Sequence, residues 1–245
     1  MNNSPKQPII GIRRSGLVDI WNAFMVEGAT FSQNDIPFCP TTTDIIPSRL
    51  ISYEEAKSIH KKEMRAGHSD YYVDAFIHFY IDDQKFDGKL SSIWLYPEKA
   101  LAIIRHFSGI IAPDFSTYAD FPDPIKRWNF YRMNAFGYWI GSSGIPVISN
   151  SRWGTEETWQ YCFDGNPYNS IIAIGTVASG IRFRKNRSLF EDGLFYMVEK
   201  LHPHTIIVYG SVNNSCFDIL RKQGIKIISF PSKTSEAFAG RKKHE

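Results

Sequence analysis

The segment that decides the fold, residues 109–150, reads GIIAPDFSTYADFPDPIKRWNFYRMNAFGYWIGSSGIPVISN. Its apolar run Ile110–Ala112 ends at Pro113 and Asp114, a proline-opened helical pattern follows, and a second apolar run closes at Asn150. Short apolar runs that alternate with helical patterns are typical of buried strands in a parallel sheet. The segment therefore predicts one strand–loop–helix–strand unit, with polar side chains where each strand ends.

This unit recurs along the chain. Strands are predicted at Val73–Asp83, Ile110–Ala112, Ile145–Ile148, Ile171–Thr176, Thr205–Gly210 and Ile225–Phe230. Helices are predicted to begin at a capping box at Ser52–Glu55, at Pro97, at Gly154–Glu157 and at a second capping box at Ser188–Glu191. One or two further strands from the first 50 residues would complete a single-domain (β/α)8-like barrel with an irregular N-terminal part. An open doubly wound parallel sheet is the alternative.

The composition suits one folded domain, since 43% of the 245 residues are hydrophobic and 15% are aromatic. We expect a loose segment at residues 1–16, one α/β domain at 17–234 and a charged tail at 235–245. The two prolines of Pro37–Pro40 predict an extended loop or an edge strand. No apolar stretch is long enough for a bilayer or a signal peptide, so we expect a cytoplasmic protein with no membrane partner. The net charge of +3 does not by itself indicate a nucleic-acid-binding protein.

Carboxylates at strand ends are the candidate catalytic groups. Ligands of parallel α/β sheets bind beyond the carboxyl ends of the strands, and Asp114, Ser116, Asp82 and Asp83 occupy such positions. Asp114 is the strongest candidate, because an apolar strand and a proline precede it. Asp82 and Asp83 are adjacent in a predicted strand, so at most one of them can face inward. The structural alternative is that Asp114 and Ser116 only satisfy backbone amides of a turn.

A second group of polar residues predicts ligand binding. It comprises Asn150, Arg152, Trp153, Thr176, Ser179, Arg182 and Arg184. A guanidinium beside an indole suits a phosphate or carboxylate next to a flat ring. The loop 175–187 combines small residues with four cations before a predicted helix N-terminus, a combination that favours anions. The alternatives are a solvated charged loop, an Arg152 paired with a loop acid, and a Trp153 that covers the rim.

Signatures of metal and cofactor sites are missing from the sequence. The histidines are scattered without metal-ligand spacing, and His78 is interpreted as a core histidine. Neither a Gly-x-Gly-x-x-Gly motif nor a P-loop follows any predicted strand. The three cysteines are widely spaced, which argues against a disulfide framework or a cysteine zinc site. The cofactor stays unknown, and carboxylates from several strands could bind a divalent cation.

Several motifs together resemble a known family. They are IPFCPTT, AFIHFYIDD, GIIAPDFSTYADFP, RWNFYRMNAFGYW, PVISNSRWG, YCFDGNPYNSIIAIGTVASG and TIIVYG. They are similar to an uncharacterised family of bacteria, phages and mobile elements, the domain of unknown function four-four-one-seven, over roughly residues 17–232. The resemblance brings no established activity, but its mobile-element setting implies work on nucleotides or nucleic acid.

Two functions are compatible with these features. The first is an enzyme that acts on a nucleotide or nucleic-acid substrate, with strand-end carboxylates for catalysis and the basic loop for phosphate. The second is a non-catalytic nucleic-acid-binding or regulatory protein that uses the sheet edge, the basic loop or the tail. The sequence leaves the oligomeric state open.

Overall fold

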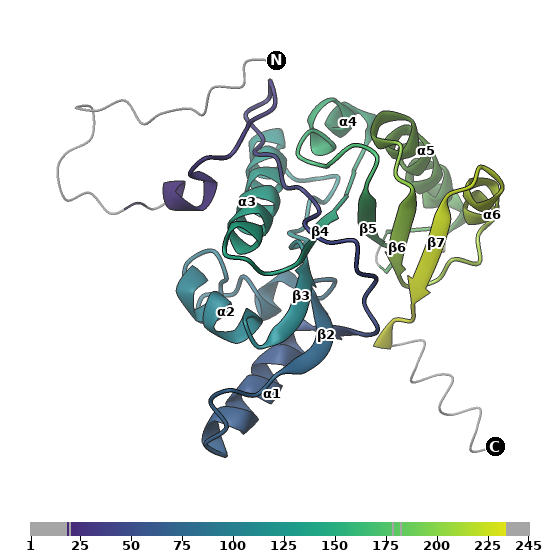
Figure 1. Ribbon diagram of the computed structural model, residues 1–245. Helices are drawn as coiled ribbons and strands as arrows, with labels where there is room; N and C mark the ends of the chain where they lie inside the picture. The colour runs from purple at the N-terminus through teal and green to yellow at the C-terminus, as the bar shows by residue number, and fades with distance from the viewer. Residues whose placement is uncertain (1–18, 20, 178, 182, 234–245) are drawn as a thin grey trace, which may run out of the picture.

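The computed structural model describes residues 19, 21–177, 179–181 and 183–233. The predicted loose segment 1–16, the charged tail 235–245 and Arg182 lie outside the described residues. Within the described part, seven parallel strands and their helices alternate along the chain (Figure 1).

The strands and helices follow the predicted order. The strands are β1 Leu50–Ser52, β2 Val73–His78, β3 Phe107–Ile111, β4 Val147–Asn150, β5 Ile171–Gly175, β6 Thr205–Tyr209 and β7 Lys226–Phe230. The α-helices are α1 Tyr53–Arg65, α2 Pro97–Ile104, α3 Asp123–Ser142, α4 Glu156–Cys162, α5 Arg184–Leu201 and α6 Ser215–Lys222. Two short 3-10 helices, η1 Ala23–Val26 and η2 Asp83–Lys85, complete the set.

Local signals placed most helix starts correctly. The capping box at Ser52 and Glu55 is present at the start of α1, and Pro97 occupies the first turn of α2. The predicted capping box at Ser188 is wrong, because α5 begins four residues earlier at Arg184 and Ser188 lies inside the helix. The strand predicted to reach Asp83 ends at His78, and Asp83 opens η2.

The sheet is open rather than a closed barrel. Each strand pairs in parallel with the next one, in the order β1-β2-β3-β4-β5-β6-β7, and no pairing of β7 with β1 occurs among the described residues. The prediction of a closed (β/α)8 barrel is therefore wrong, and the structure is a half-barrel of seven strands. The alternative was right that the sheet is open and parallel, but a doubly wound sheet needs a reversal of strand order, which this sheet lacks.

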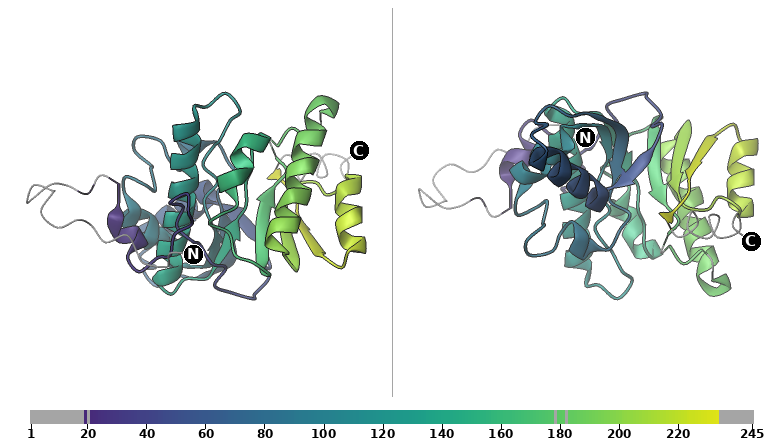
Figure 2. Two further views of the ribbon diagram at one scale, coloured as in Figure 1. Left: turned by 90° about the horizontal axis from the view of Figure 1, so that it is seen from above. Right: turned by 90° about the horizontal axis from the view of Figure 1, so that it is seen from below.

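The two faces of the sheet differ in what covers them. The larger core cluster joins one face to the helices. The second cluster consists of strand residues of the inner face, the strand-end Tyr80, and Ile46 from the segment before β1. Helices therefore cover one face only, as expected when successive right-handed crossovers follow one direction. Figure 2 shows the early elements, blue and teal, in one half of the molecule and the late ones, green and yellow, in the other.

The segment before β1 is inserted between two strands. Thr41 Oγ1 donates a hydrogen bond to the Ile171 carbonyl (2.7 Å) and accepts one from the Ser149 amide (3.0 Å). Thr42 bonds both the amide and the carbonyl of Val147. The segment thus separates the first residues of β4 and β5, whose pairing is restricted to Ser149–Ile172 and Asn150–Ala173. The segment matches the extended loop predicted at Pro37–Pro40. It lies where β4 and β5 would otherwise continue to pair.

None of the described helices has the length and apolarity that a membrane span requires.

Candidate functional site

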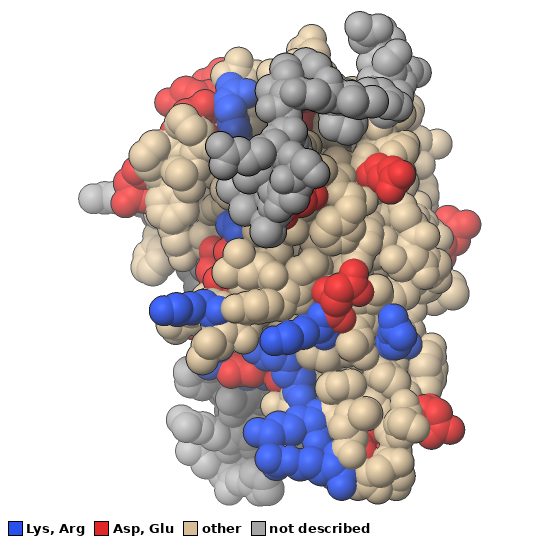
Figure 3. Space-filling view, turned by 90° about the vertical axis from the view of Figure 1, so that its left-hand side faces the viewer, with Lys and Arg blue, Asp and Glu red and all other residues tan. Residues whose placement is uncertain are grey.

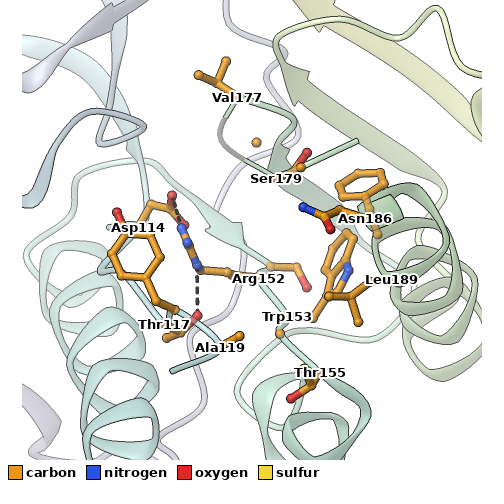
Figure 4. Close-up of a pocket in the computed structure, with 16 residues that line it drawn as sticks. Asp114, Thr117, Ala119, Arg152, Trp153, Thr155, Val177, Ser179, Asn186 and Leu189 are labelled. Carbon is orange, nitrogen blue, oxygen red and sulfur yellow. Dashed lines mark hydrogen bonds and ion pairs between the residues drawn. The ribbon is translucent and has the colours of Figure 1, made fainter. Parts of the chain in front are cut away.

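A cavity of about 340 Å³ opens at the carboxyl edge of the sheet. Three successive loops and the first turns of α5 form it (Figure 4). The lining residues are Asp114, Thr117, Tyr118, Ala119, Ser151, Arg152, Trp153, Gly154, Thr155, Gly175, Val177, Ser179, Gly180, Asn186, Leu189 and Phe190. Strands β3, β4 and β5 end side by side in the sheet, so their loops meet although they are far apart in the sequence.

An ion pair lies at one wall of this cavity. Arg152 Nη1 donates to Asp114 Oδ2 (2.6 Å), and Arg152 Nε donates to Thr117 Oγ1 (3.0 Å). The side chains of Arg152 and Asp114 keep only 24% and 14% of their surface exposed. Burial opposes the charge of Arg152, but the charge and hydrogen bond of Asp114, together with the charge of Asp83, favour it, so the pKa of Arg152 is raised. The pair therefore places a fixed cation and a carboxylate side by side in the cavity.

Asn150 holds Asp114 from the other side. Its Nδ2 donates to Asp114 Oδ1 (3.1 Å) and to the Pro113 carbonyl (3.0 Å), while its Oδ1 accepts a hydrogen bond from the Tyr80 hydroxyl (2.8 Å). Tyr80 in turn stacks on Tyr209 at the inner face, with ring centroids 5.4 Å apart. Burial raises the pKa of Tyr80 well above its usual value, so the phenol remains a donor. The predicted residues Asp114, Asn150 and Arg152 thus form one network that is anchored in the core.

The other predicted catalytic residues lie in the β3–α3 loop and at the start of η2. Asp83 accepts hydrogen bonds from the Ser116 amide (3.0 Å) and hydroxyl (2.8 Å). Burial raises the pKa of Asp83, and the charge of Asp114 adds to this effect, while the bonds from Ser116 oppose it. Asp82 is exposed. Asp83, Ser116 and Asp82 do not line the cavity, and catalysis by them stays a prediction.

Trp153 forms part of the cavity wall. Its ring lies between those of Phe163 and Phe190, with centroids 6.0 and 5.1 Å away. The indole also packs on Gly193 of α5, where a Cβ would collide with it. Trp153 therefore joins β4 to α5 and presents an aromatic surface to the cavity at the same time.

The loop after β5 contributes the opposite wall. Ser179 lines the cavity, and its Oγ donates to the Thr176 carbonyl (2.9 Å). Thr176 does not line it, because its own hydroxyl donates to the Ser211 carbonyl (3.1 Å) and so ties the loop to the end of β6. Gly180 has a φ of 79°, and a Cβ there would lie 2.9 Å from that of Asn186. Arg184 begins α5, but its side chain lies outside the described part of the structure.

Several cavity residues were not selected from the sequence, among them three polar ones. Thr117 supports Arg152, Ser151 lines the cavity, and Asn186 comes from the first turn of α5. Ser151 follows Asn150 directly, so the strand-end rule could have selected it. Asn186 lies in the loop 175–187 that was predicted to favour anions, but it was not selected, because the start of α5 was predicted too late.

No ready-made metal cage occurs in the described part of the chain: no three His, Cys, Asp or Glu side chains lie close enough together there to hold an ion. The proposed divalent cation would therefore need ligands from a substrate or from water.

Comparisons with known proteins identify the family of the chain. The family model described as "Domain of unknown function (DUF4417)" matches residues 30–231. The chain belongs to the DUF4417 family. This confirms the resemblance noted from the sequence motifs. The name of the family assigns no activity to its members.

Two curated relatives come from phages. The chain is 31% identical over 180 residues to the "Gene 1 protein" of Mycobacterium phage L5. The matched region covers 72% of this chain and 71% of that protein. The chain is 33% identical over 135 residues to the "Gene 1 protein" of Mycobacterium phage D29, which covers 55% and 48%. No solved structure matches the chain.

Proposed function

We propose that this DUF4417 protein is an enzyme that acts on a nucleotide or nucleic-acid substrate bound in the cavity at the ends of β3, β4 and β5. The observation that carries the proposal is the Asp114–Arg152 pair inside that cavity. A cation fixed by two partners is ready to meet an anionic ligand without reorganisation, and a carboxylate beside it can take or give a proton.

The shape and lining of the cavity suit a ligand with a ring and an anionic group. A volume of about 340 Å³ lies in the range of sites for small ligands. Trp153, Phe190 and Leu189 supply an apolar wall on the α5 side, and Arg152 supplies the charge on the α3 side (Figure 4). A nucleotide combines a flat base with phosphate and so matches both walls.

Within this proposal Asp114 is the catalytic group, and its neighbours position it. Asn150 and Arg152 each bond a different carboxylate oxygen, which fixes the plane of the carboxylate. Asp83 holds the loop that carries Asp114 through its bonds to Ser116. Removal of a general acid or base typically lowers the rate by about 10² to 10⁴.

The first prediction separates binding from catalysis. We expect nucleoside monophosphates or a short oligonucleotide to raise the melting temperature of the wild type, because a ligand specific for the native state stabilises it. Arg152→Ala should abolish this shift. Asp114→Asn should retain binding and lose about 10²-fold or more of turnover, measured by chromatography of the incubated ligand.

Lys200→Ala is the matched control for Arg152→Ala. Lys200 pairs with the largely buried Asp164 (2.8 Å), so its loss leaves a similarly buried carboxylate unpaired, away from the cavity. Its ligand-induced shift should equal that of the wild type. A ligand shift that persists in Arg152→Ala, or full turnover by Asp114→Asn, would contradict the proposal.

One surface favours the second function, a non-catalytic nucleic-acid-binding protein. Lys and Arg side chains gather over α1 in the lower part of the face shown in Figure 3. Lys61, Lys62 and Arg65 are exposed near the end of α1. Lys62 lies 3.9 Å from Glu63, whereas Lys61 and Arg65 form no ion pair with any described residue. Three such cations could neutralise phosphates along a duplex.

This alternative predicts salt-dependent binding without turnover. Reversing the charges of Lys61, Lys62 and Arg65 to Glu should abolish binding of a labelled DNA duplex, measured by fluorescence anisotropy at low and high salt. The control reverses Arg221 and Lys222, which are exposed in the corresponding last turn of α6. Equal loss of affinity in both variants would mean that binding depends only on the net charge of the protein. It would exclude a specific DNA-binding surface on α1.

A further inference from the structure

Ser151 carries a buried hydroxyl that has no hydrogen-bond partner among the described residues. The residue is 2% exposed, and its Oγ makes no hydrogen bond within the described part of the chain. Burying a polar group that finds no partner destabilises the folded state. Ser151 also lines the cavity. A ligand that accepts a hydrogen bond from this hydroxyl would remove the cost, which gives the residue a role beyond packing.

The N-terminus of α5 forms part of the same cavity. Asn186, Leu189 and Phe190 of its first two turns line it. The residue before the helix is Phe183, which offers no side-chain cap to the first-turn amides. An 18-residue helix carries a partial positive charge at this end and favours anions there. The helix end and the Ser151 hydroxyl therefore both favour a ligand with several acceptor oxygens.

We infer that Ser151 and the N-terminus of α5 form a phosphate subsite, and that the ligand is a nucleoside monophosphate bound through its phosphate. This inference rests on the proposed function and names the substrate class of that site. Ser151 donates to one phosphate oxygen, backbone amides at the start of α5 donate to another, and Arg152, the next residue of the loop, balances the charge. The ring of the ligand lies on the side of Trp153.

The experiment compares each nucleoside monophosphate with its own nucleoside on the full chain. Calorimetry with AMP, CMP, GMP and UMP, and with the four matching nucleosides, gives the affinity gained from the phosphate. We expect at least one monophosphate to bind about tenfold or more tightly than its nucleoside, because a hydrogen bond to a charged group is worth this much. Ser151→Ala should remove most of that gain.

The same variant should be more stable without ligand. Ser151→Ala removes a polar atom that has no partner, so we expect the melting temperature of the free protein to rise by about 2–4 °C. Ser149→Ala is the matched control. It lies two residues earlier, within β4, and is fully buried, but its Oγ accepts a hydrogen bond from Asn166 Nδ2 (2.8 Å). Ser149→Ala should lower the melting temperature and leave unchanged the affinity that a monophosphate gains over its nucleoside.

The outcomes distinguish the subsite from the function. Equal affinities of a monophosphate and its nucleoside, with binding still dependent on Arg152, would overturn the subsite and leave the proposed function intact. The subsite would also be overturned if a monophosphate gained as much affinity over its nucleoside in Ser151→Ala as in the wild type. No binding of any of the eight compounds or of an oligonucleotide would overturn both.

Discussion

His78 shows what burial does to a single ionisable residue at the end of β2. It is 1% exposed, its Nδ1 accepts a hydrogen bond from the Tyr80 amide (3.2 Å), and its ring lies 4.1 Å from that of Tyr209. Burial lowers its pKa from 6.5 to about 3, an effect that Glu55 opposes and Lys233 assists. Its position within an apolar strand predicts a core histidine, and the structure confirms the burial.

The pKa of His78 predicts loss of stability in acid. As the pH falls below 6.5, His78 becomes protonated in the unfolded chain, whereas in the folded chain it stays neutral until about pH 3. The free energy of unfolding should therefore decrease over this window by up to about 1.4 kcal/mol per pH unit. Above pH 6.5, His78 is neutral in both states and causes no loss of stability. His78→Gln keeps an acceptor but cannot titrate, so its urea-derived stability should fall less steeply with pH.

His204→Gln serves as the control for this prediction. His204 is exposed, so its replacement should leave the slope of stability against pH unchanged. A wild-type slope in His78→Gln between pH 6.5 and about 4 would show that other groups cause the acid lability.

At the scale of elements, the start of α1 links the two edges of the open sheet. Ser52 Oγ accepts from the Glu55 amide (3.3 Å), and Glu55 Oε2 accepts from the Ser52 amide (2.9 Å). Lys233, which follows β7, donates to Ser52 Oγ (3.2 Å) and pairs with Glu55 (3.1 Å). Side chains, rather than backbone pairing, thus connect β7 to the end of β1.

Two serines with the same local pattern should respond differently to truncation. Ser52→Ala removes a real cap and should lower the free energy of unfolding by about 1 kcal/mol or more, measured by urea unfolding. Ser188→Ala should change it by less than about 0.5 kcal/mol, because Ser188 is exposed inside α5 and caps nothing. Equal losses would mean that the cap at Ser52 contributes nothing beyond intrinsic helix propensity.

This pair also explains where element prediction failed. A Ser three residues before a Glu marks a helix start only if the backbone turns there, and the same spacing occurs on exposed helix faces. The turn that opens α5 lies earlier, where Phe183 bonds the Gly180 carbonyl. The strands from β2 onward were predicted correctly in number and order, because buried apolar runs between helical patterns are a local signal.

At the scale of the molecule, the described part of the chain forms seven strands and one inserted segment instead of the eight strands of a closed barrel. β1 has only three residues, and the segment with Thr41 and Ile46 occupies the sheet and its inner face before β1 begins. Closure of a barrel depends on strand number and on the register of all pairs together, so it cannot be derived from the period of any one run.

The sequence alone determined the parallel α/β class, the order of the elements and the selection of polar residues at strand ends, because these depend on local periodicity and on a general rule of parallel sheets. Only the tertiary structure decided that the sheet of the described residues stays open, that Asp114 meets Arg152 while Asp83 bonds Ser116, and that Ser151 Oγ has no hydrogen-bond partner among those residues. The physical reason is that each of these features depends on how segments far apart in the chain lie against one another. Side-chain contacts between those segments decide this, and no local pattern encodes them.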